Sequence, residues 1–547
     1  MLDGLGRQIG IVAIVAASVF VAMDGAIAAR AAGSSTVPCS GSGGGAAGLV
    51  AAVNAANAAG GGTINLASGC TYSLTATDNT VPGVGANGLP VIAAPITING
   101  RGTTIAGNNS SFRIIAISGP AGGSLTLNGI TVTGGNASGQ GPAGFGGGIF
   151  NFAGTLQLNG SVVTRNTAAG AGGGIASGTM GPGPGATLVL NNSEVSWNTV
   201  PPSGMGGGGI LSIAGTLDVN NSTIDHNSAS GGGGIASGNG TGGGAGSFIT
   251  INNSLVSDNS ATGGEDTGGG GVSNGGTLRM NNTRLIGNDA DGGVGGGLLN
   301  HAEATLNNVS VTSNSAAIGG GLANVNLQGL PAPGVTPPVP SLTLNNVTVT
   351  GNTGSVAGGG IAQFSPFGSP FGPIAAHNAQ VNGNSPNNCT PVGSVPGCRD
   401  TLYVFAAALS GDNQNPPVAT PAAGNTKVTW NTATNEMTVD IAFSGLSSGT
   451  TAAHIHCCVA PPGNAGVATT VPSFPGFPNG VTSGAYSRTF DMTASSSYNP
   501  AFVTANGGTP AGAEAALFAA LIAGQTYLNI HTTNFPGGEI RGFLEQP

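Results

Sequence analysis

The feature that most constrains the fold of this sequence is a repeat marked by a glycine triplet and a following aliphatic residue. The first copy ends at Ile149, and later copies end at Ile175, Ile210, Ile235, Val272, Leu298, Leu322 and Ile361. Successive copies are separated by about 24–26 residues, or by about 35–39 where a loop is inserted. A period of this length is typical of a solenoid, in which each repeat forms one coil.

Within each repeat, apolar and polar residues alternate, as they do over residues 154–159 and 222–227. Alternation at period two predicts short strands with one buried face. In stacked coils each strand pairs in parallel with its equivalent in the next coil, so Leu156 and Leu158 are expected to line a continuous interior. Asparagines recur where the chain must turn, and their side chains tolerate left-handed backbone or stack into ladders. They are Asn159, Asn192, Asn221, Asn253, Asn282, Asn308 and Asn346.

The N-terminal part of the chain contains two segments of a different kind. Residues 1–31 place Arg7 before an apolar run and then small residues, which is the order of a signal peptide, although retention as an anchor stays open. Residues 46–59 are the one convincing helical stretch, and they are followed by a glycine triplet. We expect this helix to cap the open first coil. No later apolar run is long enough to span a membrane.

The charge and cysteine content limit the partners and the compartment. The net charge is −9 with only 11 basic residues, so the chain lacks the basic surface that nucleic acid requires. Six cysteines fall into local pairs, and short loops favour disulfides between Cys39 and Cys70 and between Cys389 and Cys398. For the adjacent Cys457 and Cys458, a vicinal disulfide, two thiols and a metal role remain open.

The composition changes near residues 385–400, where the glycine repeats stop. Alternating segments at 427–430, 437–443, 453–456, 486–490, 527–532 and 539–544 predict strands, and residues 514–523 predict one short helix. About 145 residues of this kind suit one β-sandwich or barrel with its own core. The expected organisation is therefore a β-helix over 39–398 and an all-β domain over 400–547.

Two family resemblances follow from particular motifs. The segments 69–74 and 95–100, together with the repeats, resemble secreted bacterial right-handed parallel β-helix proteins of the pectate-lyase-like (pectin lyase) fold. This resemblance implies a fold and no single activity, because the scaffold hosts enzymes, adhesins and surface proteins. The segments 453–456, 521–532 and 535–542 resemble a CHRD (chordin-type) domain, a family of extracellular proteins whose biochemical activity is unsettled. Cys457 and Cys458 depart from the usual Gly-Pro of that family.

The C-terminal domain contains candidate ligands for a metal ion. His454 and His456 lie two residues apart and so share one face of a strand, and His531 and Glu539 could complete the ligand set. Copper or zinc would suit such ligands, with Cys457 and Cys458 as nearby soft donors. Alternatively, the histidines bond neighbouring turns, Glu539 pairs with Arg541, and no cofactor is present.

The β-helix region offers weak candidates for catalysis. Lyases and hydrolases on such scaffolds need clustered carboxylates. The carboxylates here are scattered: Asp218, Asp225, Asp258, Asp289 and Asp291, with Glu265 and Asp266 in a glycine-rich loop. The best enzymatic candidate is Asp225 with His226, close to Arg165 or Arg279 only if the coils align. Trp197 is either a sugar-stacking platform or an exposed turn residue.

Together these features favour an exported, non-catalytic surface or matrix protein. In this hypothesis the β-helix is a rod for adhesion to an extracellular polysaccharide or a surface protein, and the protein is secreted or bound to the cell surface. Two alternatives remain open: a polysaccharide lyase or glycoside hydrolase on the β-helix, and a metal-binding CHRD domain. The sequence therefore favours no enzyme activity without deciding the question.

Overall fold

The computed structural model describes residues 33–108, 111–179, 185–238, 246–263, 268–326, 339–365, 372–391, 394–396, 398, 400 and 402–546. The chain divides into a first compact unit that ends at residue 399 and a second that begins at Asp400. The expected signal peptide, residues 1–31, lies outside the described residues, as do Glu265 and Asp266. No helix in the described part of the chain is long and apolar enough to cross a membrane.

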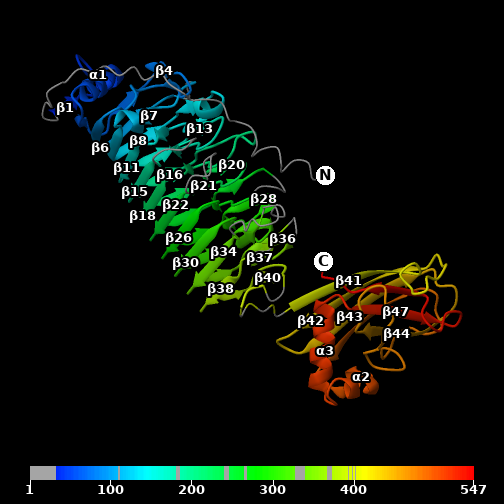
Figure 1. The fold of residues 1–547 in the computed structure, drawn as a ribbon. Coiled ribbons are helices and arrows are strands. Elements are labelled where there is room, and N and C mark those ends of the chain that lie inside the picture. The colour runs from blue at the N-terminus through cyan, green and yellow to red at the C-terminus, as the bar shows by residue number, and fades with distance from the viewer. Residues whose placement is uncertain are drawn as a thin grey trace, which may run out of the picture. The chain divides into compact units, whose positions relative to one another are not determined.

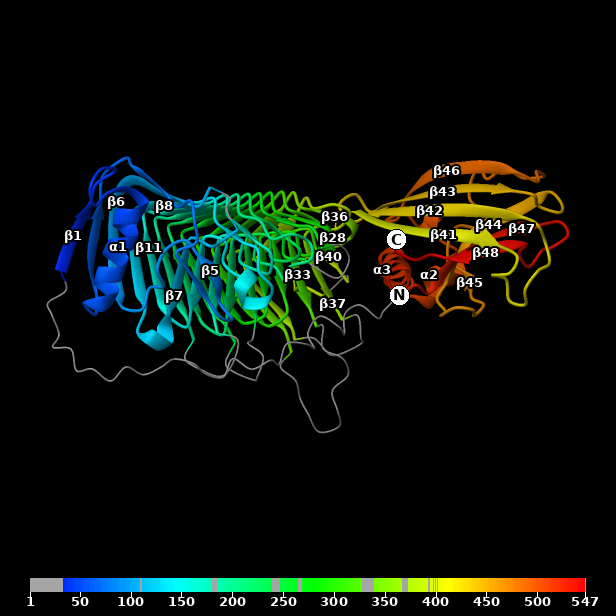
Figure 2. The ribbon, with the colours of Figure 1, turned by 90° about the horizontal axis from the view of Figure 1, so that it is seen from above.

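The first unit is a parallel β-helix, as the repeat predicts (Figure 1). Equivalent strands of successive coils pair in parallel and in register, so that Leu156 pairs with Leu188 and Leu188 with Leu217. Figure 2 shows these strands stacked along the solenoid. The first column contains β1 (Gly33–Val37), β2 (Gly62–Leu66), β6 (Pro95–Ala106), β8 (Ser124–Thr133), β11 (Thr155–Asn159), β15 (Thr187–Asn191), β18 (Thr216–Asn220), β22 (Phe248–Asn252), β26 (Thr277–Asn281), β30 (Glu303–Asn307), β34 (Ser341–Asn345) and β38 (Ile374–His377).

The remaining strands of the β-helix form further columns. The second column contains β3 (Thr71–Ser73), the ends of β6 and β8, β12 (Val162–Thr164), β16 (Glu194–Ser196), β19 (Thr223–Asp225), β23 (Leu255–Ser257), β27 (Arg284–Ile286), β31 (Ser310–Thr312), β35 (Thr348–Thr350) and β39 (Gln380–Asn382). The third contains β7 (Ile115–Ser118), β10 (Ile149–Phe152), β14 (Ile175–Gly178), β17 (Ile210–Ile213), β21 (Ile235–Gly238), β25 (Val272–Asn274), β29 (Leu298–Asn300), β33 (Leu322–Val325), β37 (Ile361–Phe364) and β40 (Cys389–Thr390).

Short strands and turns fill the gaps between these columns. They are β4 (Asn79–Val81), β5 (Gly85–Asn87), β9 (Asn136–Ala137), β13 (Thr167–Ala168), β20 (Ser228–Ala229), β24 (Ser260–Ala261), β28 (Asp289–Val294), β32 (Ser315–Ile318), β36 (Thr353–Ala357) and the 3-10 turns Gly119–Ala121 and Gly141–Gly144. The aliphatic residue after each glycine triplet, such as Ile149 or Ile210, is fully buried. The repeat marker therefore supplies one side of the solenoid core.

A ladder of buried asparagines runs through the β-helix beside the second column. In the middle of the ladder, the Asn227 amide donates to Asn259 Oδ1 at 3.0 Å, and the Asn259 amide donates to Asn288 Oδ1 at 2.9 Å. Its buried members are Asn166, Asn198, Asn227, Asn259, Asn288, Asn314 and Asn352, and the half-buried Asn384 ends it. Each rung satisfies polar groups that would otherwise be unpaired inside the core.

The asparagines singled out from the sequence occupy two other columns. Asn192, Asn221, Asn253, Asn282, Asn308 and Asn346 have positive φ, at the corner between the first and second columns. Asn159 instead belongs to a surface ladder at the ends of the first-column strands, where its amide donates to Asn128 Oδ1 at 2.8 Å. Six of the seven therefore turn the backbone. Of these six, Asn253, Asn282, Asn308 and Asn346 also form an exposed ladder, in which each amide after the first donates to the Oδ1 of the asparagine before it.

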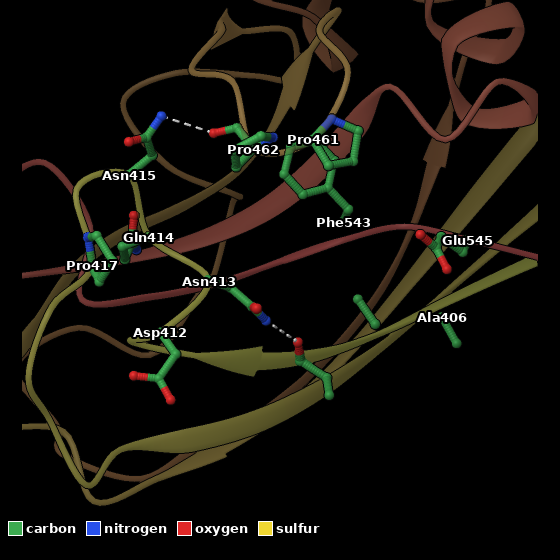
Figure 3. A pocket seen from close by; sticks show the side chains of 12 residues that line it. Ala406, Asp412, Asn413, Gln414, Asn415, Pro417, Pro461, Pro462, Phe543 and Glu545 are labelled. Atoms are coloured by element: carbon green, nitrogen blue, oxygen red, sulfur yellow. Dashed lines mark hydrogen bonds between the residues drawn. The ribbon is translucent and has the colours of Figure 1, made fainter.

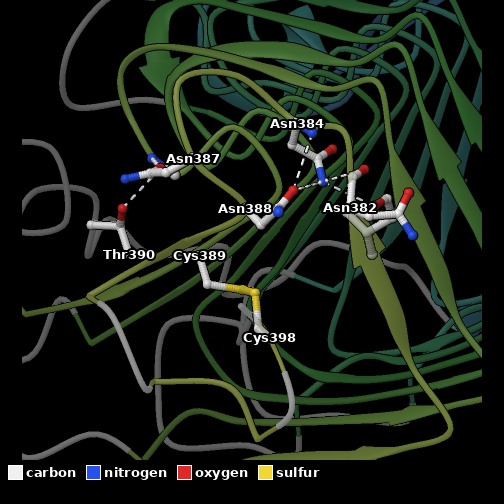
Figure 4. The surroundings of a disulfide bond; sticks show 9 residues. Asn382, Asn384, Asn387, Asn388, Cys389, Thr390 and Cys398 are labelled. Atoms are coloured by element: carbon white, nitrogen blue, oxygen red, sulfur yellow. Dashed lines mark hydrogen bonds between the residues drawn. A yellow bond between two sulfur atoms is a disulfide. The ribbon is translucent and has the colours of Figure 1, made fainter. Parts of the chain in front are cut away.

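The two ends of the solenoid are closed differently. Helix α1 (Gly45–Ala58) packs Leu49 and Val53, both fully buried, onto the first coils, and Cys39 is joined to Cys70 across it. At the other end Cys389, in β40, is joined to Cys398, as Figure 4 shows. The buried ladder ends beside that disulfide, where the Asn384 amide donates to Asn388 Oδ1 at 3.0 Å.

The second unit is a curled antiparallel sheet with two helices. Along the sheet the strand order is β45-β44-β47-β48-β41-β42-β43-β46. The strands are β41 (Leu402–Ser410), β42 (Ala423–Asn431), β43 (Glu436–Ser444), β44 (Thr450–Cys457), β45 (Gly466–Val467), β46 (Gly484–Asp491), β47 (Thr526–Thr532) and β48 (Ile540–Phe543). Helices α2 (Pro500–Ala505) and α3 (Pro510–Ile522) follow the turn Ser495–Ser497.

Helix α3 covers one aromatic part of this sheet. The Phe518 ring lies 5.2 Å from that of Trp430 and 4.9 Å from that of Tyr403. The helix begins four residues earlier than expected, because Thr509 accepts a hydrogen bond from Gly512 N and Pro510 occupies the first turn. Helix α2 and strand β1 had no clear sequence pattern and were not expected.

Candidate functional site

Three histidines meet on one face of the C-terminal sheet. His454 and His456 lie on β44, and His531 lies on the neighbouring β47, opposite Ala452. One ring nitrogen of each histidine lies within 4.8 Å of those of the other two. His454 and His456 are buried and His531 is half-buried. The pairing of β44 with β47 thus brings together residues about 75 positions apart in the chain.

Each histidine is held through its other ring nitrogen by a backbone carbonyl. His454 Nε2 bonds Pro472 O at 2.7 Å, His456 Nδ1 bonds Ala465 O at 2.9 Å, and His531 Nδ1 bonds Pro536 O at 2.9 Å. A carbonyl only accepts, so these nitrogens carry the protons. The nitrogens left with lone pairs, His454 Nδ1, His456 Nε2 and His531 Nε2, are buried and have no hydrogen-bond partner.

The electrostatic surroundings keep the three imidazoles neutral. Burial lowers the pKa of His454 and of His456 to about 4, and it also lowers the pKa of His531. Neutral imidazole is the form that binds a metal. A carbonyl that fixes the tautomer of a ligating histidine is a common outer-shell feature of metal sites.

Glu539 is not part of this cluster. Its carboxylate accepts hydrogen bonds from Ser447 N and Thr420 Oγ1 at 2.8 Å, from Thr532 Oγ1 at 2.8 Å and from Ser447 Oγ at 3.0 Å. Burial alone would raise the pKa of Glu539, but these hydrogen bonds lower it overall. The structure therefore gives this carboxylate a role in holding loops together, distinct from the ligand role considered from the sequence.

Arg541 does not pair with Glu539 either. It is 1% exposed, and its guanidinium donates to Asn413 O, Asn464 Oδ1, Pro462 O and Gly463 O. The guanidinium carbon lies 4.6 Å from the ring centre of Tyr527, which stacks on His456 at 4.8 Å. A buried cation therefore sits behind the histidine cluster, and its described hydrogen-bond partners are neutral.

Cys457 and Cys458, directly after His456, form a disulfide with each other. Their sulfurs are therefore not thiolate ligands in this state, and the described residues contain no free cysteine.

Comparison with known families identifies this part of the chain. Residues 405–544 match the CHRD domain family. This segment is a CHRD domain. The resemblance read from the motifs around His454 and His531 is thereby confirmed, and the candidate metal centre lies inside the CHRD domain.

Comparison with whole proteins is less informative. No curated protein matches the chain. Among solved structures, the chain is similar to the Azotobacter vinelandii mannuronan C-5 epimerase AlgE6 A-module, with 14% identity over 61% of this chain and 94% of that one and a TM-score of 0.28. We draw no functional argument from so distant a similarity.

In the β-helix, the candidate residues gather at one corner. Arg165, Trp197, His226 and Asp258 follow β12, β16, β19 and β23 at equivalent positions in four successive coils. Trp197 is 51% exposed, and its ring stacks on that of His226 at 4.2 Å. Arg279 lies in the first column, aligned with Thr250 and Thr305, and is not part of this corner.

Carboxylates surround this corner column. His226 Nδ1 bonds Asp225 Oδ2 at 2.7 Å, while the other oxygen, Asp225 Oδ1, is buried without a partner. The pKa of Asp225 is raised by burial, against the hydrogen bond from His226, and the nearby charges of Glu194 and Asp258 raise it further. Glu194 was not among the sequence candidates, although it precedes Trp197 by three residues within the same repeat.

The other carboxylates considered from the sequence lie elsewhere. Asp218 is in the first column, and Asp289 and Asp291 are in β28, where Asp289 accepts from Ser315 Oγ at 2.6 Å. Of the carboxylates considered in the described part of the β-helix, those that lie near one another are Glu194, Asp225 and Asp258.

The CHRD domain also has an open pocket of about 560 Å³. Figure 3 shows it between the loop that carries Asp412 to Pro417 and Pro461 and Pro462, with Phe543 and Glu545 on the strand side. The Asn415 amide closes one edge by donating to Pro462 O at 2.9 Å. The three histidines do not line this pocket, so it is separate from the candidate metal centre.

Proposed function

We propose that the CHRD domain of this protein binds one transition-metal ion through His454, His456 and His531. The observation that carries the proposal is that three buried ring nitrogens without hydrogen-bond partners lie close together. The other nitrogen of each ring is fixed by a hydrogen bond to a backbone carbonyl. An isolated buried polar atom is costly, and three of them aimed at one point are best explained by a shared ligand.

The ion would act first on the architecture of the domain. The three carbonyls belong to three separate connections, which contain Ala465, Pro472 and Pro536. Metal–nitrogen bonds of about 2.0–2.1 Å require the histidines to close in by roughly 1 Å from their present spacing. Binding would therefore lock three loops against β44 and β47, and its free energy would add to that of folding.

The test is elemental analysis of the full chain after exposure to zinc and copper and extensive dialysis. We expect one metal ion per wild-type chain and less than about a tenth of that in His531→Ala. The matched control is His377→Ala, because His377 is exposed in the β-helix and should not affect metal content. Wild-type protein without metal, or His531→Ala with full metal content, would refute the proposal.

A second candidate function concerns the β-helix. We infer that the corner column of Arg165, Trp197, His226 and Asp258 binds a neutral glycan, with one sugar face on Trp197. These four residues have φ of 53–57°, whereas the preceding and following coils place Gly134 and Gly287 there. A left-handed conformation costs a non-glycine residue roughly 1–2 kcal/mol. Four such residues in succession support selection for their side chains.

Charge supports a neutral sugar over a uronic acid. Glu194, Asp225 and Asp258 outnumber Arg165 at this corner, so an anionic polymer would be repelled. Affinity electrophoresis in hydroxyethylcellulose and in polygalacturonate would test this. We expect retardation in the neutral polymer alone, and its loss in Trp197→Ala but not in Phe248→Ala, which removes an equally exposed aromatic ring. Equal mobility of wild type and Trp197→Ala in the neutral polymer would refute glycan binding here.

The wider role that we propose is that of an exported, non-catalytic surface or matrix protein, either secreted or bound to the cell surface. Its three disulfides are typical of an oxidising compartment. The alternative, a polysaccharide lyase or hydrolase, would need Glu194 and Asp225 to act as acid and base. Release of new reducing ends or unsaturated sugars from a glycan, abolished by Asp225→Asn, would favour that alternative.

A further inference from the structure

The ligand set of the histidine cluster carries no negative charge. The described residues of the cluster are three histidines, without a carboxylate. The other ligands considered from the sequence are already occupied, because Glu539 accepts four hydrogen bonds and Cys457 is bonded to Cys458. A bound ion would therefore keep its full charge, since neutral imidazoles do not offset it.

The buried guanidinium of Arg541 acts against a highly charged ion. It lies over the Tyr527 ring, and Tyr527 in turn stacks on His456. Only one aromatic ring therefore separates this fixed positive charge from the His456 imidazole, and the charge would repel a cation bound there. The cost of burying an ion grows with the square of its charge, so a divalent ion costs roughly four times as much as a monovalent one.

The surroundings of the cluster also favour a low coordination number. All three free nitrogens are buried from solvent. Zinc in structural sites is almost always four-coordinate, so it would require a fourth ligand that these residues do not supply. Imidazole nitrogens suit both copper and zinc, so the type of donor does not discriminate between them. The number of donors does, because three ligands satisfy monovalent copper.

We propose that the histidine cluster selects monovalent copper, Cu(I), over divalent zinc. The inference rests on the proposed function, because it requires that His454, His456 and His531 bind a metal at all. It adds the identity of the ion, which follows from three neutral ligands, a buried neighbouring cation and shielding from solvent.

The experiment measures both affinities on the full, disulfide-intact chain. Copper is kept monovalent with ascorbate under anaerobic conditions and competed with bathocuproine disulfonate, and zinc is competed with a chromophoric chelator. We expect Cu(I) to bind at least about 100-fold more tightly than zinc, and His531→Ala to lose the Cu(I) site. Zinc binding as tightly as Cu(I) overturns the selectivity alone. Failure of both ions to bind overturns the proposed function as well.

A designed variant tests the cause of the selectivity. Ala452 pairs with His531 across β44 and β47 and lies on the same strand face as His454. Ala452→Asp would add the missing negative ligand, so we expect zinc affinity to rise by about tenfold or more and the preference for Cu(I) to shrink. Ala452→Asn is the uncharged control of similar size. If Asp and Asn change the two affinities alike, charge does not set the selectivity.

Discussion

At the scale of single residues, the three clustered histidines of the CHRD domain are distinguished from ordinary buried histidines by the ring nitrogen that has no partner. A structural histidine usually has partners on both sides of the ring or exposes one nitrogen to water. Here the protonated side of each ring is bonded and the lone-pair side is buried. The same logic applies to Asp225, whose one oxygen bonds His226 while the other is buried without a partner.

Glu539 is the residue whose loss should most destabilise the CHRD domain. Its side chain is fully buried and accepts hydrogen bonds from Thr420, Ser447 and Thr532, which lie on separate segments. Glu539→Gln keeps the size but places an amide against these donors, and we expect a loss of about 2–4 kcal/mol in the free energy of unfolding. Urea denaturation would measure it. Glu545→Gln, at an exposed position, should change the value by less than about 0.5 kcal/mol.

His301 makes the stability of the β-helix depend on pH. Burial lowers its pKa from 6.5 to about 4, so between these values the unfolded chain binds more protons than the folded one. Stability from this group is therefore complete above pH 6.5 and is lost as the pH falls towards 4. We expect the melting temperature to fall over this range, and to fall less in His301→Gln. The exposed His377→Gln should follow wild type, and a His301→Gln profile identical to that of wild type would contradict the assignment.

The sequence predicted the arrangement of residues that lie close together in the chain, and failed for partners that only folding brings together. His454 and His456 share a face because strand geometry fixes it, and Cys39 and Cys70 flank the predicted cap. The carbonyls of Ala465, Pro472 and Pro536 could not be foreseen, because any backbone offers a carbonyl and only the folded loops bring these three to the rings. The pairing of Arg541 with Glu539 that the sequence suggested was wrong for the same reason, because the actual partners of Arg541 are loop groups that only folding brings to it.

At the scale of elements, the buried asparagine ladder and the corner asparagines illustrate two uses of one residue type. Asn259 donates to Ile224 O and Asn288 Oδ1 and accepts from Asn227, all inside the core. Asn253 is exposed and supplies a left-handed backbone, with φ of 50°, while its Oδ1 accepts a solvent-exposed hydrogen bond from the Asn282 amide. Sequence periodicity detects that both recur, but the distinction depends on which way the backbone turns at each position.

The two asparagine columns should respond differently to substitution. Asn259→Ala leaves several buried groups unpaired, so we expect a loss of about 3 kcal/mol or more from the β-helix. Asn253→Gly preserves the turn because glycine adopts positive φ freely, so the change should stay within about 0.5 kcal/mol. Chemical denaturation of both variants would measure the difference. Similar losses in the two variants would mean that the buried asparagine ladder contributes no more to the free energy of unfolding than the exposed corner asparagines.

The N-terminal disulfide should stabilise the capped end of the solenoid. Cys39 and Cys70 are 31 positions apart and enclose α1, whose Leu49 and Val53 are buried against the first coils. Closing a loop of this length contributes roughly 3–4 kcal/mol by restricting the unfolded chain. We expect the double variant Cys39→Ser/Cys70→Ser to lose about this amount and to expose α1 to amide exchange. The pair Cys389→Ser/Cys398→Ser, at the other end, should leave exchange in α1 unchanged.

At the scale of the whole molecule, the two compact units have separate hydrophobic cores. One core runs from Leu49 through Leu156 to Ile374 along the solenoid, and the CHRD domain has its own, with Trp430, Phe405 and Ile455. Units with separate cores unfold as separate cooperative transitions. Calorimetry of the full chain should therefore resolve two transitions, and Glu539→Gln should lower one of them while Asn259→Ala lowers the other.

Metal binding provides the strongest test of this independence, because it should act on one transition alone. A ligand that binds only the folded state stabilises it by RT ln(1 + [L]/Kd), which is about 2.7 kcal/mol at a hundredfold excess over Kd. The proposed ligands all lie in β44 and β47 of the CHRD domain, so Cu(I) should raise the melting temperature of that transition and leave the β-helix transition unchanged. In His531→Ala neither should move. A rise in both transitions of the wild type would show that the stabilities of the two units are coupled, or that copper also binds the β-helix. Repeating the titration with Trp197→Ala and His226→Ala would separate these causes, because the corner column contains the exposed His226 imidazole, which stacks on Trp197.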